Sequence, residues 1–216
     1  MKRNIIPRGN KRRFAISDVH GCIETFKTLV HEKIALQKED QLFLLGDYVN
    51  RGPGSVGVLE EIYTLISQGY QVYPIRGNHE DKFLEEFGKK LSPAHKELIE
   101  SMPYYYETED FIFVHAGLNF TLDDPLEDTK TMKWGLGFRI EPDYDFLDGK
   151  KIIHGHVITS LSEIFDAVMD QTTYIPIDNG CYRSLKYEET AYGTLVALDL
   201  NEMRMVVQEN VDIKKY

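Results

Sequence analysis

The chain has 216 residues, of which 42% are hydrophobic and 28% charged, and its formal net charge is −10. This acidic balance argues against a nucleic-acid backbone as partner, and no apolar run approaches the roughly 20 residues that cross a bilayer. The N-terminus has no secretory pattern, and two cysteines cannot form a disulfide framework. We therefore expect a cytoplasmic globular protein without a membrane or nucleic-acid partner.

Residues 1–12 form a basic N-terminal segment that contains no acidic side chain. A solvated start to the chain is the expected interpretation, and an anchor for an anionic partner is the alternative. The remainder, residues 13–216, is long enough for one domain with a sizeable core, and no linker or repeat divides it.

The first third of the chain alternates β-like apolar runs with helix-like periodicity. We expect strands at 13–17, 41–45 and 70–75, and helices at 23–37 and 56–67. A β-α-β-α-β order implies parallel strand pairing with right-handed crossovers.

The rest of the chain is less regular at first and rich in strand-like runs later. Helices are expected at 81–90 and 93–101, a hairpin at 104–106 and 111–115, and an irregular acidic excursion at 118–150. Further strands are expected at 152–153, 163–168, 173–177, 194–200 and 203–209. The order predicts an α/β fold with two packed sheets and helices outside.

Polar side chains follow most of these strands at the point where each strand ends. Asp18 and His20 follow the first strand, Asp47 lies one β-α unit later, and Asn78 one unit after that. Such units deliver the carboxyl ends of their strands to one rim of a sheet. His115 and His156 follow two later strands. A mixed carboxylate, amide and imidazole set suits Mn, Fe or Zn, and Asp47 could bridge two ions.

Five short motifs closely resemble the phosphoprotein phosphatase branch of the calcineurin-like metallophosphoesterases and occur in that family's order. They are Ser17-Asp18-Val19-His20-Gly21, Gly46-Asp47-Tyr48-Val49-Asn50-Arg51-Gly52, Arg76-Gly77-Asn78-His79-Glu80, His115-Ala116-Gly117 and Gly155-His156. The resemblance implies the calcineurin-like sandwich, with two mixed β-sheets flanked by helices, and two divalent cations. Mn²⁺ is the expected metal, with Fe or Zn as alternatives.

The resemblance also implies a role for each matched residue. The first ion would be held by Asp18, His20 and Asp47, and the second by Asp47, Asn78, His115 and His156. Phosphate would be bound by Arg51, Arg76 and Asn78, while His79 would act as the general acid.

Two departures from the family pattern affect the expected chemistry. Asn50 stands where the family usually has an Asp that supports the acid histidine, so His79 is predicted to be a weaker or differently tuned acid. Bacterial members often carry an Arg two positions after a Trp, whereas here the next arginine after Trp134 is Arg139. Arg139 is the candidate for that third phosphate contact.

Hydrolysis of a phosphoester is the predicted activity, and a serine/threonine protein phosphatase is the first expectation. A symmetrical dinucleoside tetraphosphate hydrolase is the alternative, which needs an adenine pocket from residues 81–110 or 118–150. A phosphate-binding relative with little turnover, caused by Asn50, is the third possibility.

Other polar residues receive simpler interpretations. His154 is expected to support the metal ligands, with plain packing as the alternative. His31 and His95 are interpreted as structural or exposed. Cys22 and Cys181 are interpreted as small buried residues, although thiols beside a metal site could respond to oxidants.

Overall fold

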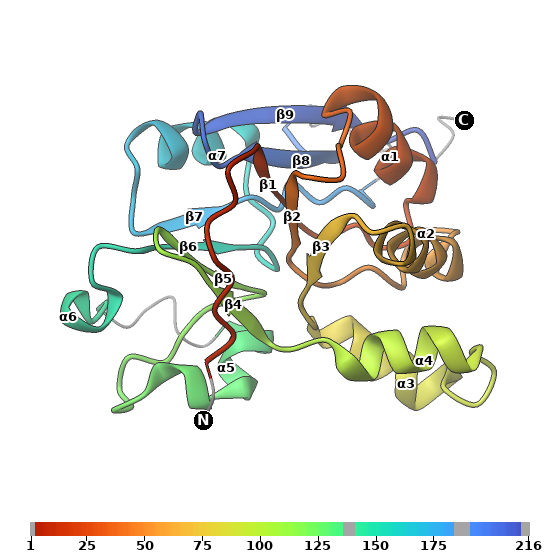
Figure 1. Cartoon of the computed structure of the whole chain (residues 1–216), viewed down its shortest axis with the longest axis horizontal. Helices are drawn as coiled ribbons and strands as arrows, with labels where there is room; N and C mark the ends of the chain where they lie inside the picture. The colour runs from red at the N-terminus through yellow and green to blue at the C-terminus, as the bar shows by residue number, and fades with distance from the viewer. Residues whose placement is uncertain (1–2, 136–140, 184–190, 213–216) are drawn as a thin grey trace.

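A five-stranded sheet holds the first three expected strands in parallel. The structure is a computed structural model that describes residues 3–135, 141–183 and 191–212. The strand order is β3-β2-β1-β8-β9 (Figure 1). Its strands are β1 (Arg13–Ile16), β2 (Gln41–Leu44), β3 (Gln71–Pro74), β8 (Thr194–Asp199) and β9 (Arg204–Glu209). Antiparallel pairing of β8 with β1 and β9 makes the sheet mixed.

The second sheet has the order β4-β5-β6-β7. Its strands are β4 (Tyr105–Glu107), β5 (Phe111–Val114), β6 (Lys151–His154) and β7 (Tyr174–Pro176). The pair β4–β5 is the expected antiparallel hairpin, and β5, β6 and β7 are parallel. Parallel strands place the residues that follow them at one edge, so β5 and β6 can deliver side chains to a common rim.

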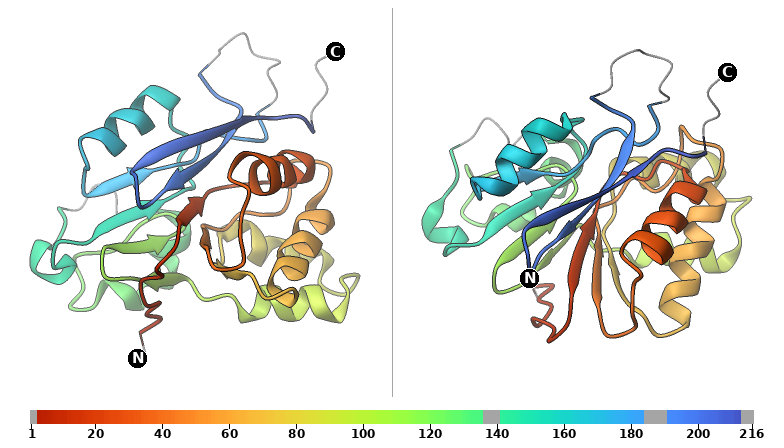
Figure 2. Two further views of the ribbon diagram at one scale, coloured as in Figure 1. Left: turned by 45° about the horizontal axis from the view of Figure 1, so that its top comes forward. Right: turned by 90° about the horizontal axis from the view of Figure 1, so that it is seen from above.

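Alternating side chains of the strands build a core on each face of the sheets. Phe43 and Val196 of the first sheet pack with Phe113 and Ile153 of the second, which forms the layer between the sheets. Leu42 belongs instead to the cluster beneath the first helices. Figure 2 shows the resulting layers, with the two sheets facing each other and helices outside. The fold is therefore the expected α/β metallophosphoesterase sandwich.

Seven α-helices and two other helical segments accompany the strands in the part of the chain that the structure describes. They are α1 (Ile23–Lys27), a π-helical continuation (Thr28–Lys33), α2 (Ser55–Ser67), α3 (Asn78–Phe87), α4 (Pro93–Ser101), a 3-10 turn (Pro125–Glu127), α5 (Thr129–Trp134), α6 (Tyr144–Leu147) and α7 (Leu161–Met169). None of these helices is long and apolar enough to cross a membrane.

One expected strand is wrong, because residues 163–168 lie within the helix α7. Ser160 caps this helix by accepting from the backbone N–H of Glu163, whose side chain in turn accepts from the N–H of Ser160. Ile164 and Val168, four residues apart, are the buried residues of its inner face. An apolar run with helical spacing resembles a strand when the window is short.

Other boundaries differ less from expectation. The helix expected at 23–37 ends at Lys33, and α3 begins at Asn78 rather than at residue 81. The excursion at 118–150 contains the short helices α5 and α6. Arg139 lies outside the residues that the structure describes.

Residues 3–12 lie against both sheets instead of standing apart from them. Ile5 forms a bridge to Glu107, and the Arg3 guanidinium lies 3.3 Å from the Glu107 carboxylate. The Arg12 guanidinium lies 2.6 Å from Asp40. Acids of the chain itself thus neutralise part of this basic segment, and the division into residues 1–12 and 13–216 stays a prediction.

Candidate metal centre and its pocket

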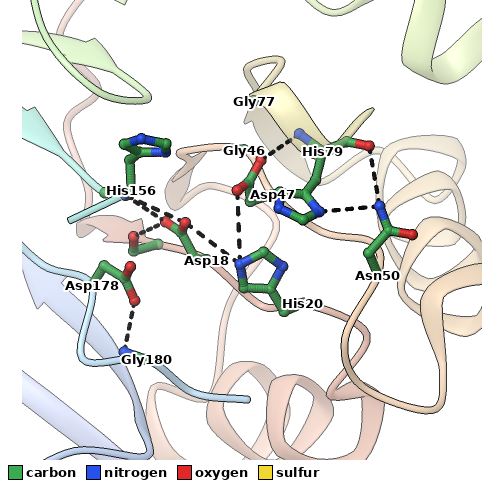
Figure 3. Close-up of polar contacts among 12 residues, drawn as sticks. Asp18, His20, Gly46, Asp47, Asn50, Gly77, His79, His156, Asp178 and Gly180 are labelled. Carbon is green, nitrogen blue, oxygen red and sulfur yellow. Dashed lines mark hydrogen bonds and ion pairs between the residues drawn. The ribbon is translucent and has the colours of Figure 1, made fainter. Parts of the chain in front are cut away.

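The predicted metal ligands from both sheets meet at one rim of the sandwich. Asp18 follows β1 and Asp47 follows β2, while Asn78 begins α3 directly after β3. His115 and His156 come from the loops that follow β5 and β6. Figure 3 shows Asp18, His20, Asp47 and His156 pointing toward one another. The β-α spacing therefore predicted this convergence correctly.

Two groups of donors lie close enough together to hold an ion each. His20, Asp47 and His79 form one group, and Asp47, His115 and His156 form the other, with the donor atoms of each group within 4.8 Å of one another. Asp47 is common to both groups. Its Oδ2 lies 3.7 Å from His20 Nε2 and 3.4 Å from His115 Nε2.

Asn78 and Asp18 complete these two groups. His115 Nε2 lies 3.1 Å from Asn78 Oδ1 and 3.1 Å from His156 Nδ1. Asp18 Oδ2 lies 4.0 Å from His20 Nε2. Asp47 at the centre, with donors on both sides, is the arrangement that a carboxylate bridge between two ions requires.

The backbone that presents these ligands is held in uncommon conformations. His20, Asp47 and His156 have φ values of 48°, 53° and 67°, in the left-handed region that non-glycine residues seldom adopt. A Cβ added to Gly77 would lie 2.3 Å from Asp47 Oδ1, and one added to Gly155 would lie 2.1 Å from Asp18 Oδ1. Only glycine allows the neighbouring backbone to approach the two carboxylates so closely.

Three buried carboxyl groups, those of Asp18, Asp47 and Asp178, lie at the base of the site, and two of them resist ionisation. Burial and the neighbouring Asp47 raise the pKa of Asp18 to about 7. Burial and Asp18 raise the pKa of Asp178 well above its ordinary value. Burial also opposes ionisation of Asp47, but His115 and His20 outweigh it and lower the pKa of Asp47. A bound cation would offset the cost of ionising all three.

The imidazoles divide into two kinds. Burial lowers the pKa of His20 and of His156 to about 4, so both rings are neutral and ready to donate a lone pair to a metal. Burial also disfavours the charged form of His115, but Asp47 and Asp18 outweigh it and raise the pKa of His115 to about 10. These donors fit divalent transition metals, and the choice of Mn²⁺ over Fe or Zn stays a prediction.

His79 and Asn50 are in contact, as the sequence pattern predicted. Asn50 Nδ2 lies 3.1 Å from His79 Nδ1, and the His79 backbone N–H donates to Asp47 Oδ1 at 2.9 Å. The contact with Asn50 occupies Nδ1, which leaves the other ring nitrogen, Nε2, available for proton transfer. Burial lowers the pKa of His79, and the cations Arg51 and Lys82 add to that effect.

Two carboxylates of the site received no role from the sequence. Asp178 follows β7, lines the pocket and accepts a 2.7 Å hydrogen bond from the Gly180 N–H. Its position after a strand was the signal that could have identified it. Glu80, fully buried, accepts from the backbone N–H groups of Asp47, Tyr48 and Gly77, and so joins two ligand loops.

Above the ligands lies a pocket of about 210 Å³ that brings only some of the predicted phosphate-binding residues together. Its lining comprises Asp18, His20, Asp47, Arg51, Asn78, His79, Lys82, Trp134, His156, Ile158, Asp178 and Tyr182. Arg51 lies over the Tyr182 ring, 4.4 Å from its centroid. Arg76 is not in this lining, and its guanidinium lies 2.7 Å from Asp81. Its assignment to phosphate stays a prediction, as do those of Arg51 and Asn78.

The remaining histidines and cysteines have partners outside the pocket. His154 is buried, and its Nδ1 lies 3.0 Å from the Gly155 carbonyl oxygen, so it contacts the loop that carries His156. His31 pairs with Glu61 and His95 with Glu60, each at 2.7 Å.

Cys22 and Cys181 are free and buried. The neighbouring Cys22 and burial both raise the pKa of Cys181 well above its ordinary value. A protonated, buried thiol is a poor nucleophile, which favours the interpretation of these cysteines as small buried residues.

Comparison with known proteins identifies one family across most of the chain. The family model described as "Calcineurin-like phosphoesterase" matches residues 12–192. A "Bis(5'-nucleosyl)-tetraphosphatase, symmetrical" from Buchnera aphidicola subsp. Acyrthosiphon pisum is 31% identical over 126 residues. That match covers 49% of this chain and 44% of the relative, so it spans less than half of the relative's length.

Solved structures with the same fold carry different names. A "putative diadenosine tetraphosphatase" is 18% identical, covers 95% of this chain and 97% of its own, and has a TM-score of 0.66. A "Protein serine/threonine phosphatase" from Saccharomyces cerevisiae is 16% identical, covers 99% and 85%, and has a TM-score of 0.64. At these identities the likeness shows the fold alone.

Proposed function

The chain belongs to the calcineurin-like phosphoesterase family, and on that premise we propose that it hydrolyses symmetrical dinucleoside tetraphosphates. The observation that carries this proposal is the set of curated relatives, which are named symmetrical tetraphosphatases and are 30–42% identical over their matched segments. The pocket supports it, because Arg51 and Lys82 line it together with the metal ligands. A substrate with several linked phosphates has enough negative charge to bind both of these cations.

A serine/threonine protein phosphatase, which the motifs suggested first, is the rival substrate class. It rests on the motif resemblance, while the curated relatives favour the tetraphosphatase. Both activities share the same ligands and the same acid, so the two proposals differ in what surrounds the phosphoryl group.

The residues around the pocket have distinct proposed roles. The first ion would be held by Asp18, His20 and Asp47, and the second by Asp47, Asn78, His115 and His156. Such ions supply Lewis-acid polarisation of the phosphoryl oxygens and activation of the attacking water.

The acid and the phosphate clamp come from the chain itself. Arg51, positioned by the Tyr182 ring, would bind a phosphoryl oxygen, because a guanidinium matches phosphate geometry. His79, held by Asn50 at Nδ1, would deliver the proton of its other ring nitrogen to the leaving oxygen.

Turnover of three substrates by the purified protein with Mn²⁺ tests the proposal. The substrates are diadenosine tetraphosphate, a phosphoserine peptide and an aryl phosphate, and the products are separated chromatographically. Symmetrical cleavage gives two molecules of ADP, which is the expected result, with a higher kcat/KM than for the peptide.

Three outcomes would contradict it. ATP plus AMP as products would exclude symmetrical cleavage, and a faster peptide reaction would favour the protein phosphatase. Absence of turnover on all three substrates, with bound metal verified by elemental analysis, would identify a phosphate-binding relative in which Asn50 limits the acid. Asp47→Asn serves as the inactive control, since loss of the shared ligand should cost at least about 100-fold.

A further inference from the structure

Lys82 is a pocket cation whose aromatic neighbour is Trp134. It lies on α3, three residues after His79, so the two side chains are neighbours on the helix surface. Lys82 Nζ lies over the Trp134 ring, 4.8 Å from its centroid. Its charge helps to lower the pKa values of His79 and His156, which places it beside both the acid and a metal ligand.

Two other cations nearby, Arg76 and Lys133, share one carboxylate. Asp81, the residue before Lys82, binds both the Arg76 guanidinium and the Lys133 ammonium group. Among the residues that the structure describes, Lys82 has no carboxylate within ion-pair distance. An ammonium group with a ring but no anion as its neighbour is available to a charged ligand.

Trp134 supplies a surface on which a base can stack. It is the last residue of α5, its side chain lines the pocket, and it is 44% exposed. Its ring meets that of His156 edge to face, with the centroids 6.4 Å apart. Exposed aromatic rings beside cationic side chains bind nucleotides by stacking the base while the cation holds the phosphate.

We propose that Lys82 and Trp134 form a subsite for the departing nucleoside diphosphate: Lys82 binds its phosphates and Trp134 stacks its base. This assignment rests on the proposed function, in which symmetrical cleavage releases such a product. The position of His79 assigns the side of the scissile bond, because the acid that protonates the leaving oxygen lies one helical turn from Lys82. Arg51 also acts on His79, but its guanidinium lies over the Tyr182 ring, which meets the ring of His20 rather than that of Trp134.

Fluorescence of Trp134 reports binding at this subsite directly, because it is the only tryptophan of the chain. ADP, AMP and pyrophosphate are titrated into the metal-loaded protein. ADP is expected to change the emission and to bind more tightly than AMP. Lys82→Met should weaken ADP binding by about 10-fold or more, the value of one charge-assisted hydrogen bond.

Lys133→Met is the matched control, because it removes a lysine held by Asp81 rather than one that lines the pocket. It should leave ADP affinity within about twofold. Equal losses in the two variants, or no loss in Lys82→Met, would overturn the proposal. Circular dichroism verifies that both variants fold.

Calorimetric titration of Trp134→Leu separates the base from the phosphates. This variant should lose ADP affinity and keep pyrophosphate affinity, whereas Lys82→Met should lose both. If Trp134→Leu keeps its affinity for both ADP and pyrophosphate, the base does not stack on this ring.

Failure of the subsite is distinguishable from failure of the proposed function, because these titrations need no turnover. A protein that fails to cleave diadenosine tetraphosphate but binds ADP through Lys82 would refute the function and keep the subsite. A protein that cleaves diadenosine tetraphosphate to two ADP, but whose affinity for ADP does not change in Lys82→Met, would support the function and refute the subsite.

Discussion

Two groups of charges around helix α3 differ in what neutralises them. On the pocket side, Lys82 lies over the Trp134 ring and beside His79. Arg51, on the loop after β2, lies over the Tyr182 ring. Outside the pocket lining, Asp81 gathers Arg76 and Lys133 into one ion-pair cluster. The partner, more than the residue type, thus indicates whether a cation is available to substrate or is part of the structure.

Removal of the two arginines should give the largest contrast between these groups. Arg51→Met should lower kcat/KM for an aryl phosphate by about 100-fold or more, because a phosphate-binding guanidinium is lost. Arg76→Met should cost less than about 10-fold, since its guanidinium is held by Asp81. Steady-state kinetics of the two variants decides, and an equal loss would mean that Arg76 leaves Asp81 to bind phosphate.

The outer cluster should matter for stability instead. Asp81→Asn leaves two partly buried cations without their anion, and we expect it to lower the free energy of unfolding by about 1–3 kcal/mol. Urea unfolding of the metal-loaded protein measures this. Glu85→Gln, an exposed change on the same helix, should stay within about 0.5 kcal/mol. If both variants unfold alike, the cluster is not a stabilising one.

Asn50 tests whether the acid on the pocket side is limited by a missing charge. Asn50→Asp places a carboxylate beside His79 Nδ1 and should raise the pKa of the imidazole. A phosphoserine peptide needs a protonated leaving oxygen, so its rate should rise by up to about 10-fold, whereas an aryl phosphate should change little. A peptide rate that does not change, or an equal fall for both substrates, would show that Asn50 does not limit the acid.

Lys82 should also affect the titration of His79, and this is the smallest expected effect. Its positive charge contributes to the lowered pKa of His79, so Lys82→Met should raise that pKa. A higher pKa keeps the acid protonated to higher pH. NMR titration of the His79 ring measures the change, with Lys133→Met as the control that should leave it in place. A downward shift in Lys82→Met would contradict the contact between these side chains.

Prediction from the sequence succeeded where local pattern and regular geometry determine position. The spacing of Asp18, Asp47 and Asn78 follows from repeated β-α units, whose strand ends share one rim. It failed for α7, because a short apolar run is compatible with strand or helix until the Ser160 cap is recognised. Asp178 was missed because it has no matched motif, although it follows a strand as the candidate metal ligands do.

The sequence by itself determined the family, the sandwich and the convergence of the candidate metal ligands, since each depends on the order of strands and on short motifs that follow them. Only the tertiary structure decided which cations are free. Asp81 and Lys133 are separated by 52 positions, and Lys82 and Trp134 by as many, so no local pattern distinguishes the two lysines. Ion pairs and ring contacts of this kind form only when distant helices pack, and they determine which charges line the pocket.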